Sequence, residues 1–189
     1  QRIALWLIKG VDGEIKTASL AGNMLSSLLY VHGEKSASDT ISNLAAPYMN
    51  NICLIEGIGL FGNKVAPKDI GAARYTDVKR TKFAQKALYV DNNILPMEEN
   101  YDGSNYSPST FLPLIPIILL NGIKGMALGW STNILPRDLN DITSATMEYL
   151  KKGKINNELM PFYNKLDLIV EKVEEGSYSF TGKLEVINT

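Results

Sequence analysis

The stretch that decides the fold is EIKTASLAGNMLSSLLYVHGEKSASDTISNLAAP, residues 14–47. Apolar residues recur at helical spacing from Glu14 to Leu29 and again in the second half of the stretch. A short turn with Gly33 separates the two runs, Ser36-Ala-Ser-Asp39 fits a capping box, and Pro47 ends the second run. Two helices joined by a tight glycine-containing turn predict a helix-turn-helix, a motif that on its own often binds nothing.

The segments around this motif predict an α+β chain. Helices are expected at residues 2–9 and from a capping Asp138 to Leu150. Residues 91–109 are polar and turn-rich and are expected to form an exposed connection. Five segments have the apolar, proline-bordered or alternating pattern of extended chain: residues 51–56, 111–120, 126–130, 166–173 and 178–187.

A glycine-rich stretch, Gly57-Ile-Gly-Leu-Phe-Gly62, fits the pattern of dinucleotide-binding loops. That site needs a helix that opens at the third glycine, so that its N-terminus faces the pyrophosphate. Here the chain continues Asn-Lys-Val-Ala-Pro-Lys, with no apolar period. We therefore expect a loop in which glycine permits a close backbone approach, and no nucleotide site.

Composition sets the remaining bounds. The 189 residues are 45% hydrophobic, which suits one domain or one domain with an appendage. The single cysteine, Cys53, lies in an apolar run and offers neither an internal disulfide nor a Cys/His metal site. No apolar run is long enough to span a bilayer, so no membrane partner is expected. Both ends look cut, and we expect a fragment of a cytoplasmic protein, or of a nuclear one if the source is eukaryotic.

Positive charge is concentrated in one segment. Residues 64–86 hold seven basic and two acidic side chains, a local net charge of +5 in a chain whose overall charge is -1. This polarisation is typical of a phosphate-binding face, although a solvated helix face would show the same count.

Short motifs follow one another in a particular order along nearly the whole chain. They are Lys16-Thr-Ala-Ser-Leu-Ala-Gly22, Tyr30-Val-His-Gly-Glu34 with Ser36, Glu56-Gly-Ile-Gly-Leu-Phe-Gly62, Ala73-Arg-Tyr-Thr76, Asn100-Tyr-Asp-Gly103, Pro113-Leu-Ile-Pro116, Asn121-Gly122, Gly125-Met-Ala-Leu-Gly-Trp-Ser131, Asn133-Ile134 and Pro136. Their order resembles the DNA breakage-reunion subunit of type IIA DNA topoisomerases. The group includes gyrase A subunits, the eukaryotic type II enzymes and the T4-like phage enzymes.

The resemblance implies a catalytic set of four residues. Tyr75 would attack a DNA phosphodiester and become linked to a 5′-phosphate. Arg74 and Arg2 would hold that phosphate, because a guanidinium offers paired donors and keeps its charge. The preferred role of His32 would be to contact the phosphate, and the alternative role would be to assist proton transfer. The family usually has another histidine just before this one, where this chain has Tyr30-Val31, so a two-histidine relay is not expected.

The resemblance also implies DNA contacts outside the catalytic set. Met126 would be the apolar wedge that unstacks a base step in the bent DNA. The contacts to the DNA backbone would come from Lys16, Ser36, Lys79 and Lys82.

By this resemblance the fold is a winged-helix breakage domain, residues 1–153, followed by part of a β-rich tower, residues 154–189. The whole enzyme would be an ATP-dependent type II topoisomerase and a homodimer acting on double-stranded DNA. Mg²⁺ would be bound by a TOPRIM domain and ATP by an ATPase domain, both outside this chain, and the fragment alone is expected to be inactive. Two other interpretations remain open: a winged-helix module that binds DNA without its own catalysis, and a soluble domain whose charged face is only solvated.

Overall fold

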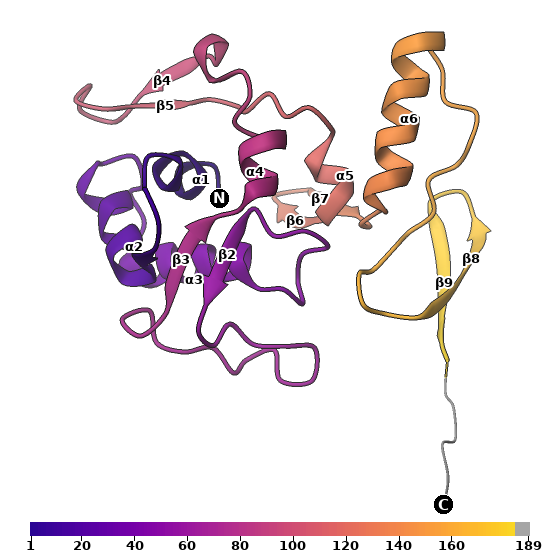
Figure 1. The fold of residues 1–189 in the computed structure, drawn as a ribbon, viewed down its shortest axis with the longest axis horizontal. Helices are drawn as coiled ribbons and strands as arrows, with labels where there is room; N and C mark the ends of the chain where they lie inside the picture. The colour runs from indigo at the N-terminus through magenta and orange to yellow at the C-terminus, as the bar shows by residue number, and fades with distance from the viewer. Residues whose placement is uncertain (184–189) are drawn as a thin grey trace, which may run out of the picture. The chain divides into compact units, whose positions relative to one another are not determined.

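The computed structural model describes residues 1–183, and its contacts divide the chain into two compact units, residues 1–114 and residues 115–189. The first unit contains a winged helix (Figure 1). Its elements are, in chain order, α1 (Arg2–Lys9), β1 (Ile15–Lys16), α2 (Thr17–Ser26), α3 (Glu34–Ala45), β2 (Ile55–Ile58) and β3 (Asp77–Arg80). The strands form an antiparallel sheet in the order β1-β3-β2. The long connection between β2 and β3, residues 59–76, is called the wing below.

The apolar residues that recur at helical spacing in the sequence form the core of this unit. Each of the three helices turns one apolar face inward, and the sheet closes the core with Ile55 and Val78, both fully buried. The helical residues of the core are Ala4, Leu5 and Ile8 from α1, Leu20, Ala21 and Met24 from α2, and Ala37, Ile41, Leu44 and Ala45 from α3.

The first unit continues through α4 (Lys82–Ala87) and a short 3₁₀ helix (Asn92–Ile94) to a hairpin of β4 (Met97–Glu99) and β5 (Tyr106–Pro108). This hairpin packs on α1: the Trp6 indole Nε1 donates to the Tyr106 carbonyl oxygen at 3.2 Å. The exposed connection predicted for residues 91–109 is therefore partly wrong, because it contains two paired strands.

The second unit holds α5 (Ile117–Asn121), a hairpin of β6 (Ile123–Ala127) and β7 (Trp130–Ile134), α6 (Leu139–Lys152), and a hairpin of β8 (Leu168–Glu174) and β9 (Ser177–Gly182). Its small core is built on Leu120 and Ile142, which are almost completely buried. Asp138 caps α6 as predicted, and its carboxylate accepts from the backbone N–H groups of Asn140 and Asp141. The predicted strand 178–187 ends at Gly182 among the described residues, and residues 184–189 lie outside them.

Three local predictions are wrong for identifiable reasons. The second helix of the motif begins at Glu34 with Gly33 as its N-cap, so Ser36 lies inside the first turn and no capping box forms. Ile15 and Lys16 belong to a strand, because β1 pairs with β3 far along the chain. The segment 111–120 is not extended throughout, because α5 starts directly after Pro116. Proline is tolerated at the N-terminus of a helix, where its missing backbone N–H would have no intrahelical partner in any case.

The contacts separate the units after Leu114. The predicted boundary between a breakage domain and a tower at residues 153 and 154 concerns a different division and stays a prediction.

Candidate active site

Tyr75 lies at the end of the wing, two residues before β3 begins. Its side chain is 70% exposed, and its backbone N–H closes a turn on the Ala72 carbonyl oxygen at 2.8 Å. The Arg74 guanidinium carbon lies 4.7 Å from the centre of the Tyr75 ring, within cation–π range. The phenol and the guanidinium therefore face solvent together, where a phosphate could reach both.

The residue after Tyr75 anchors the wing to α2. Thr76 is buried, and its hydroxyl donates to the buried hydroxyl of Thr17 at 2.8 Å. The first backbone N–H groups of α2 donate to the wing: Thr17 to the Thr76 carbonyl at 3.0 Å and Ala18 to the Ala73 carbonyl at 3.1 Å. Helix N-termini carry N–H groups without intrahelical partners, and α2 has no side-chain cap, so the wing itself caps the helix. Tyr75 is thus an exposed side chain on a fixed backbone.

Glycines let the two sides of the wing approach each other. The Gly71 N–H donates to the Leu60 carbonyl at 2.8 Å, and Phe61 forms a bridge with Ile70. Gly59 has φ +111°, and a Cβ built on Gly71 would lie 3.1 Å from the Thr76 Cγ2. The described chain forms no helix at Gly62, so the expected glycine loop is confirmed and the helix that the dinucleotide pattern requires does not follow it.

His32 lies in the exposed turn between α2 and α3. The ring of Tyr30 meets the His32 ring edge-on, with centroids 5.1 Å apart. The Tyr30 hydroxyl and the Ser36 Oγ are 2.6 Å apart in a hydrogen bond. Tyr30 therefore brings two of the predicted residues, His32 and Ser36, to the N-terminus of α3.

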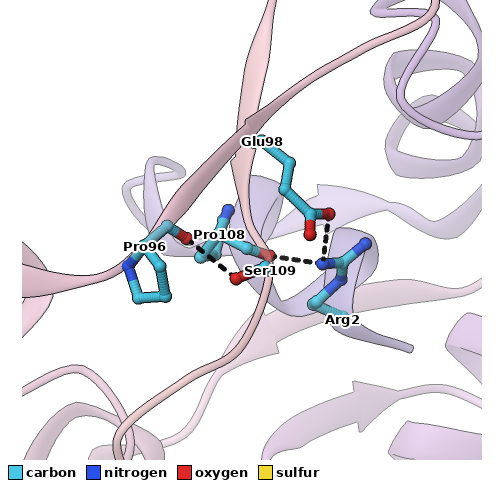
Figure 2. A network of polar contacts seen from close by, with 5 residues as sticks. All are labelled: Arg2, Pro96, Glu98, Pro108 and Ser109. Carbon is cyan, nitrogen blue, oxygen red and sulfur yellow. Dashed lines mark hydrogen bonds and ion pairs between the residues drawn. The ribbon is translucent and has the colours of Figure 1, made fainter.

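Arg2 begins α1 and is held by the β4–β5 hairpin, as Figure 2 shows. Its Nη1 donates to the Glu98 Oε2 at 3.2 Å and to the Pro108 carbonyl oxygen at 2.8 Å. No sequence pattern singled out Glu98. The turn signal Asn100-Tyr-Asp-Gly103 between two short runs is the feature that would have indicated a hairpin and drawn attention to its strands.

Two of the predicted DNA-contacting lysines are already neutralised. The Lys16 Nζ lies 2.6 Å from the Asp77 Oδ2, and Lys79 lies 3.4 Å from Glu56 and 3.5 Å from Glu14. The hydrogen bond to Glu56 and its negative charge raise the pKa of the Lys79 amine, so Lys79 stays protonated but paired. Lys82 differs: it is exposed, and it forms no ion pair with any residue in 1–183.

Met126 belongs to the second unit. It lies on β6 opposite Ser131 and is 89% exposed. The tip of the same hairpin exposes Leu128 and Trp130, and Gly129 makes the turn with φ +76°. A hairpin that shows several large apolar side chains to solvent is typical of a surface that inserts into a partner.

The structure thus brings the predicted residues together in groups. Arg74 and Tyr75 share the wing, with Lys16 beside them through the pairing of β1 with β3. His32 and Ser36 form a second group and Arg2 a third, and no hydrogen bond within residues 1–183 joins either group to Tyr75. Residues 1–183 contain no cluster of three or more His, Cys, Asp or Glu side chains that could hold a metal ion. Within the same range, every helix is too short or too polar to cross a membrane.

Comparison with known proteins gives a consistent picture. Residues 1–189 match the family of the DNA gyrase/topoisomerase IV A subunits. DNA topoisomerase 2 of Meyerozyma guilliermondii is 32% identical over 188 residues, which cover 95% of this chain and 13% of the yeast protein. The DNA topoisomerase medium subunit of Enterobacteria phage T4 is 32% identical over 175 residues, 90% of this chain and 38% of the phage protein.

A solved structure agrees in fold. The DNA-binding, cleavage and re-ligation domain of Plasmodium falciparum topoisomerase II superposes with a TM-score of 0.89 at 28% sequence identity, covering 99% of this chain and 26% of that one. The chain therefore spans well under half the length of the relatives it matches.

Proposed function

Because the chain belongs to the family of DNA gyrase and topoisomerase IV A subunits, we propose that it is the breakage-reunion part of a type II DNA topoisomerase. In this proposal Tyr75 cuts the backbone of double-stranded DNA and reseals it after another duplex has passed. The carrying observation is the Tyr75 geometry: an exposed phenol beside a guanidinium, on a backbone fixed to the N-terminus of α2. The proposal places the protein where its DNA is, in the cytoplasm of a bacterium or phage-infected cell, or in a nucleus.

The proposed reaction exchanges one ester for another. The Tyr75 phenolic oxygen bonds to phosphorus while the bond from phosphorus to the deoxyribose 3′ oxygen breaks. The phenolic proton leaves to a base, the 3′ oxygen takes up a proton, and the 5′-phosphate stays on the tyrosine. One alkyl ester of the phosphate is replaced by one aryl ester, so the number of phosphoester bonds is unchanged and the reverse attack by the 3′ hydroxyl restores the DNA without an energy source at that step.

The neighbouring residues would stabilise charge on the phosphate. Arg74 lies against the nucleophile and can donate to the phosphate oxygens throughout the reaction. Arg2 would hold the same phosphate with its unused N–H groups, and His32 would donate to a phosphate oxygen or accept the phenolic proton. Lys82, Lys16, Lys79 and Ser36 would contact the DNA backbone, and Met126 would enter the base stack.

Magnesium and ATP belong to other parts of the proposed enzyme. The residues described here do not fit a magnesium ion, because they contain no acidic cluster able to hold one. We propose that a TOPRIM domain carries Mg²⁺, that an ATPase domain binds ATP, and that two copies form the working dimer. The proposed breakage domain covers residues 1–153, and residues 154–189 would begin the tower.

The test is the covalent adduct. In the assembled enzyme with magnesium and supercoiled DNA, Tyr75→Phe removes the nucleophilic oxygen and abolishes the protein–DNA adduct trapped by denaturant, while DNA affinity is retained. Tyr101→Phe is the matched control, because Tyr101 is 91% exposed in the same unit and is given no role. An adduct that persists in the Tyr75→Phe enzyme would contradict the proposal.

A second function has one observation in its favour. Lys82 begins α4 shortly after β3, is exposed and forms no ion pair among residues 1–183, which suits a winged helix that only holds DNA. If the enzyme assembly never forms an adduct but binds duplex DNA through this face, the module interpretation replaces the enzyme.

A further inference from the structure

We propose that Glu98 is a positioning residue that presents Arg2 to the DNA phosphate. This inference rests on the proposed function. It concerns a side chain on the β4–β5 hairpin that touches neither the wing nor the turn around His32 through any described hydrogen bond or ion pair. The role would pass entirely through the guanidinium of Arg2.

The guanidinium of Arg2 is held at one of its three nitrogens. Both hydrogen bonds of Arg2 leave from one nitrogen, Nη1, toward Glu98 and the Pro108 carbonyl oxygen (Figure 2). The Nε and Nη2 groups donate to no residue in 1–183. The Arg2 side chain is 37% exposed, so these donors can be reached from solvent. An arginine anchored at one nitrogen and free at the others is suited to bind an anion with its remaining fork.

The hairpin is itself held by hydrogen bonds, which fix the positions of the two groups that accept from Arg2, the Glu98 carboxylate and the Pro108 carbonyl oxygen. The Ser109 backbone N–H and hydroxyl both donate to the Pro96 carbonyl oxygen, at 2.8 and 3.3 Å, and close the open end of the hairpin (Figure 2). Met97 pairs with Pro108 and Glu98 with Ser107, which sets the side of the strand from which Glu98 reaches Arg2.

Two further bonds hold the hairpin to the helical body. The Trp6 Nε1 donates to the Tyr106 carbonyl, and the Asn100 side-chain amide donates to the Ser27 carbonyl at the end of α2 at 3.0 Å. Glu98 is therefore a carboxylate on a braced strand, and Arg2 is a long side chain that would otherwise lose orientation.

The negative charge of Glu98 serves here to orient Arg2. An arginine side chain has many rotamers, and all but one must be excluded when the transition state forms. The Glu98 carboxylate adds a charge-assisted hydrogen bond that selects one of them, while the Pro108 carbonyl fixes the plane. An exposed ion pair of this kind contributes little to folding stability, so its effect is expected in the reaction and not in the unfolding curve.

The experiment uses the full enzyme assembly with magnesium and a duplex that carries one preferred cleavage site. We expect Glu98→Gln to lower the single-turnover rate of adduct formation roughly 10- to 100-fold, the size of effect that misplacement of a catalytic group produces. DNA affinity and the unfolding midpoint stay unchanged. Glu98→Asp should recover part of the rate, because the charge remains on a shorter side chain.

The matched control is Glu99→Gln, which removes the same charge one residue away. Glu99 accepts from the Tyr106 hydroxyl and has no described contact with Arg2, so its variant should cleave at the parent rate. In an Arg2→Ala background, Glu98→Gln should have no further effect, because a residue that acts through Arg2 has nothing left to position.

Three results would overturn the inference: a normal rate in Glu98→Gln, equal losses in Glu98→Gln and Glu99→Gln, or an additive loss in the Arg2→Ala background. Faster cleavage or tighter binding in Glu98→Gln would also overturn it, and would show that Glu98 competes with DNA for Arg2. If Tyr75→Phe abolishes the adduct while Glu98→Gln is normal, only this inference fails. If the adduct survives in Tyr75→Phe, the proposed function fails first.

Discussion

The wing and the β6–β7 hairpin each offer solvent a large side chain, Tyr75 on one and Met126 on the other, but they are built differently. The end of the wing is attached to α2 by the backbone hydrogen bonds that Thr17 and Ala18 donate to it and by the buried contact between Thr76 and Thr17. All residues of the β6–β7 hairpin from Ile123 to Asn133 are exposed, and it is held mainly by its own strand pairing.

This difference in attachment fits the different roles proposed for the two side chains. A nucleophile must approach phosphorus along one line, so a fixed backbone favours reaction. A side chain that enters a base stack must follow the DNA as it bends, and a lightly attached hairpin permits this. The comparison therefore predicts that changes in the wing alter chemistry and stability, whereas changes at the hairpin tip alter DNA binding and leave the fold intact.

The largest effect is expected from substituting Arg74, and it should differ in kind from the effect of substituting Met126. Arg74→Ala should slow adduct formation about 10²- to 10³-fold with little change in affinity, because it removes a donor aimed at transition-state charge. Met126→Ala should weaken binding and DNA bending while bound DNA is still cut. Single-turnover cleavage and affinity over a range of salt concentrations measure both. The comparison breaks if Arg74→Ala mainly lowers affinity and flattens the salt dependence, since that marks a simple backbone contact.

A pair of glycines tests the attachment of the two regions directly. Gly62 in the wing and Gly129 in the hairpin have nearly equal φ angles, +74° and +76°. A Cβ on Gly62 would lie 2.9 Å from the Pro67 carbonyl oxygen, whereas a Cβ on Gly129 meets nothing within 4 Å. Alanine at Gly129 should cost about 1–2 kcal/mol for the left-handed backbone alone, and alanine at Gly62 about 1–3 kcal/mol more. Urea denaturation gives both values, and equal losses would mean that the wing yields as easily as the hairpin.

A further expected effect, of similar size, concerns the anchor under Tyr75. Thr76→Val leaves the buried Thr17 hydroxyl without its partner and should lower the free energy of unfolding by about 1–3 kcal/mol. The double variant with Thr17→Val should recover much of the loss, because no hydroxyl is then left unpaired. Thr143→Val on the exposed face of α6 is the control and should stay within about 0.5 kcal/mol. If the double variant is less stable than Thr76→Val, the hydroxyl pair does not hold the wing.

Capping residues and the spacing of apolar residues were enough to predict part of this structure from the sequence. They indicated α1, the two helices of the motif and the capped start of α6, because those features depend on neighbouring residues. They failed at Ile15 and Lys16 and at the β4–β5 hairpin, where short strands exist only through partners elsewhere in the chain. They also placed a cap at Ser36, because Gly33 as an N-cap leaves no polar side chain to signal the true start.

The site divides in the same way. The exposed Tyr75 beside Arg74 follows from adjacency in sequence, and the family resemblance named both. The ion pairs of Arg2, Lys16 and Lys79 do not, because each joins residues about 20 to 100 positions apart in this chain, where pattern gives no distance. The roles of the individual site residues stay predictions until the variants above are measured.

The carboxylates already seated on Lys16 and Lys79 have a consequence for how ionic strength acts on the complex. A DNA phosphate that docked on such a lysine would have to displace Asp77 or Glu56, whose negative charge already balances that of the lysine. Because Lys79 is one of the seven cations between residues 64 and 86, counting all seven overstates how steeply salt would weaken DNA binding.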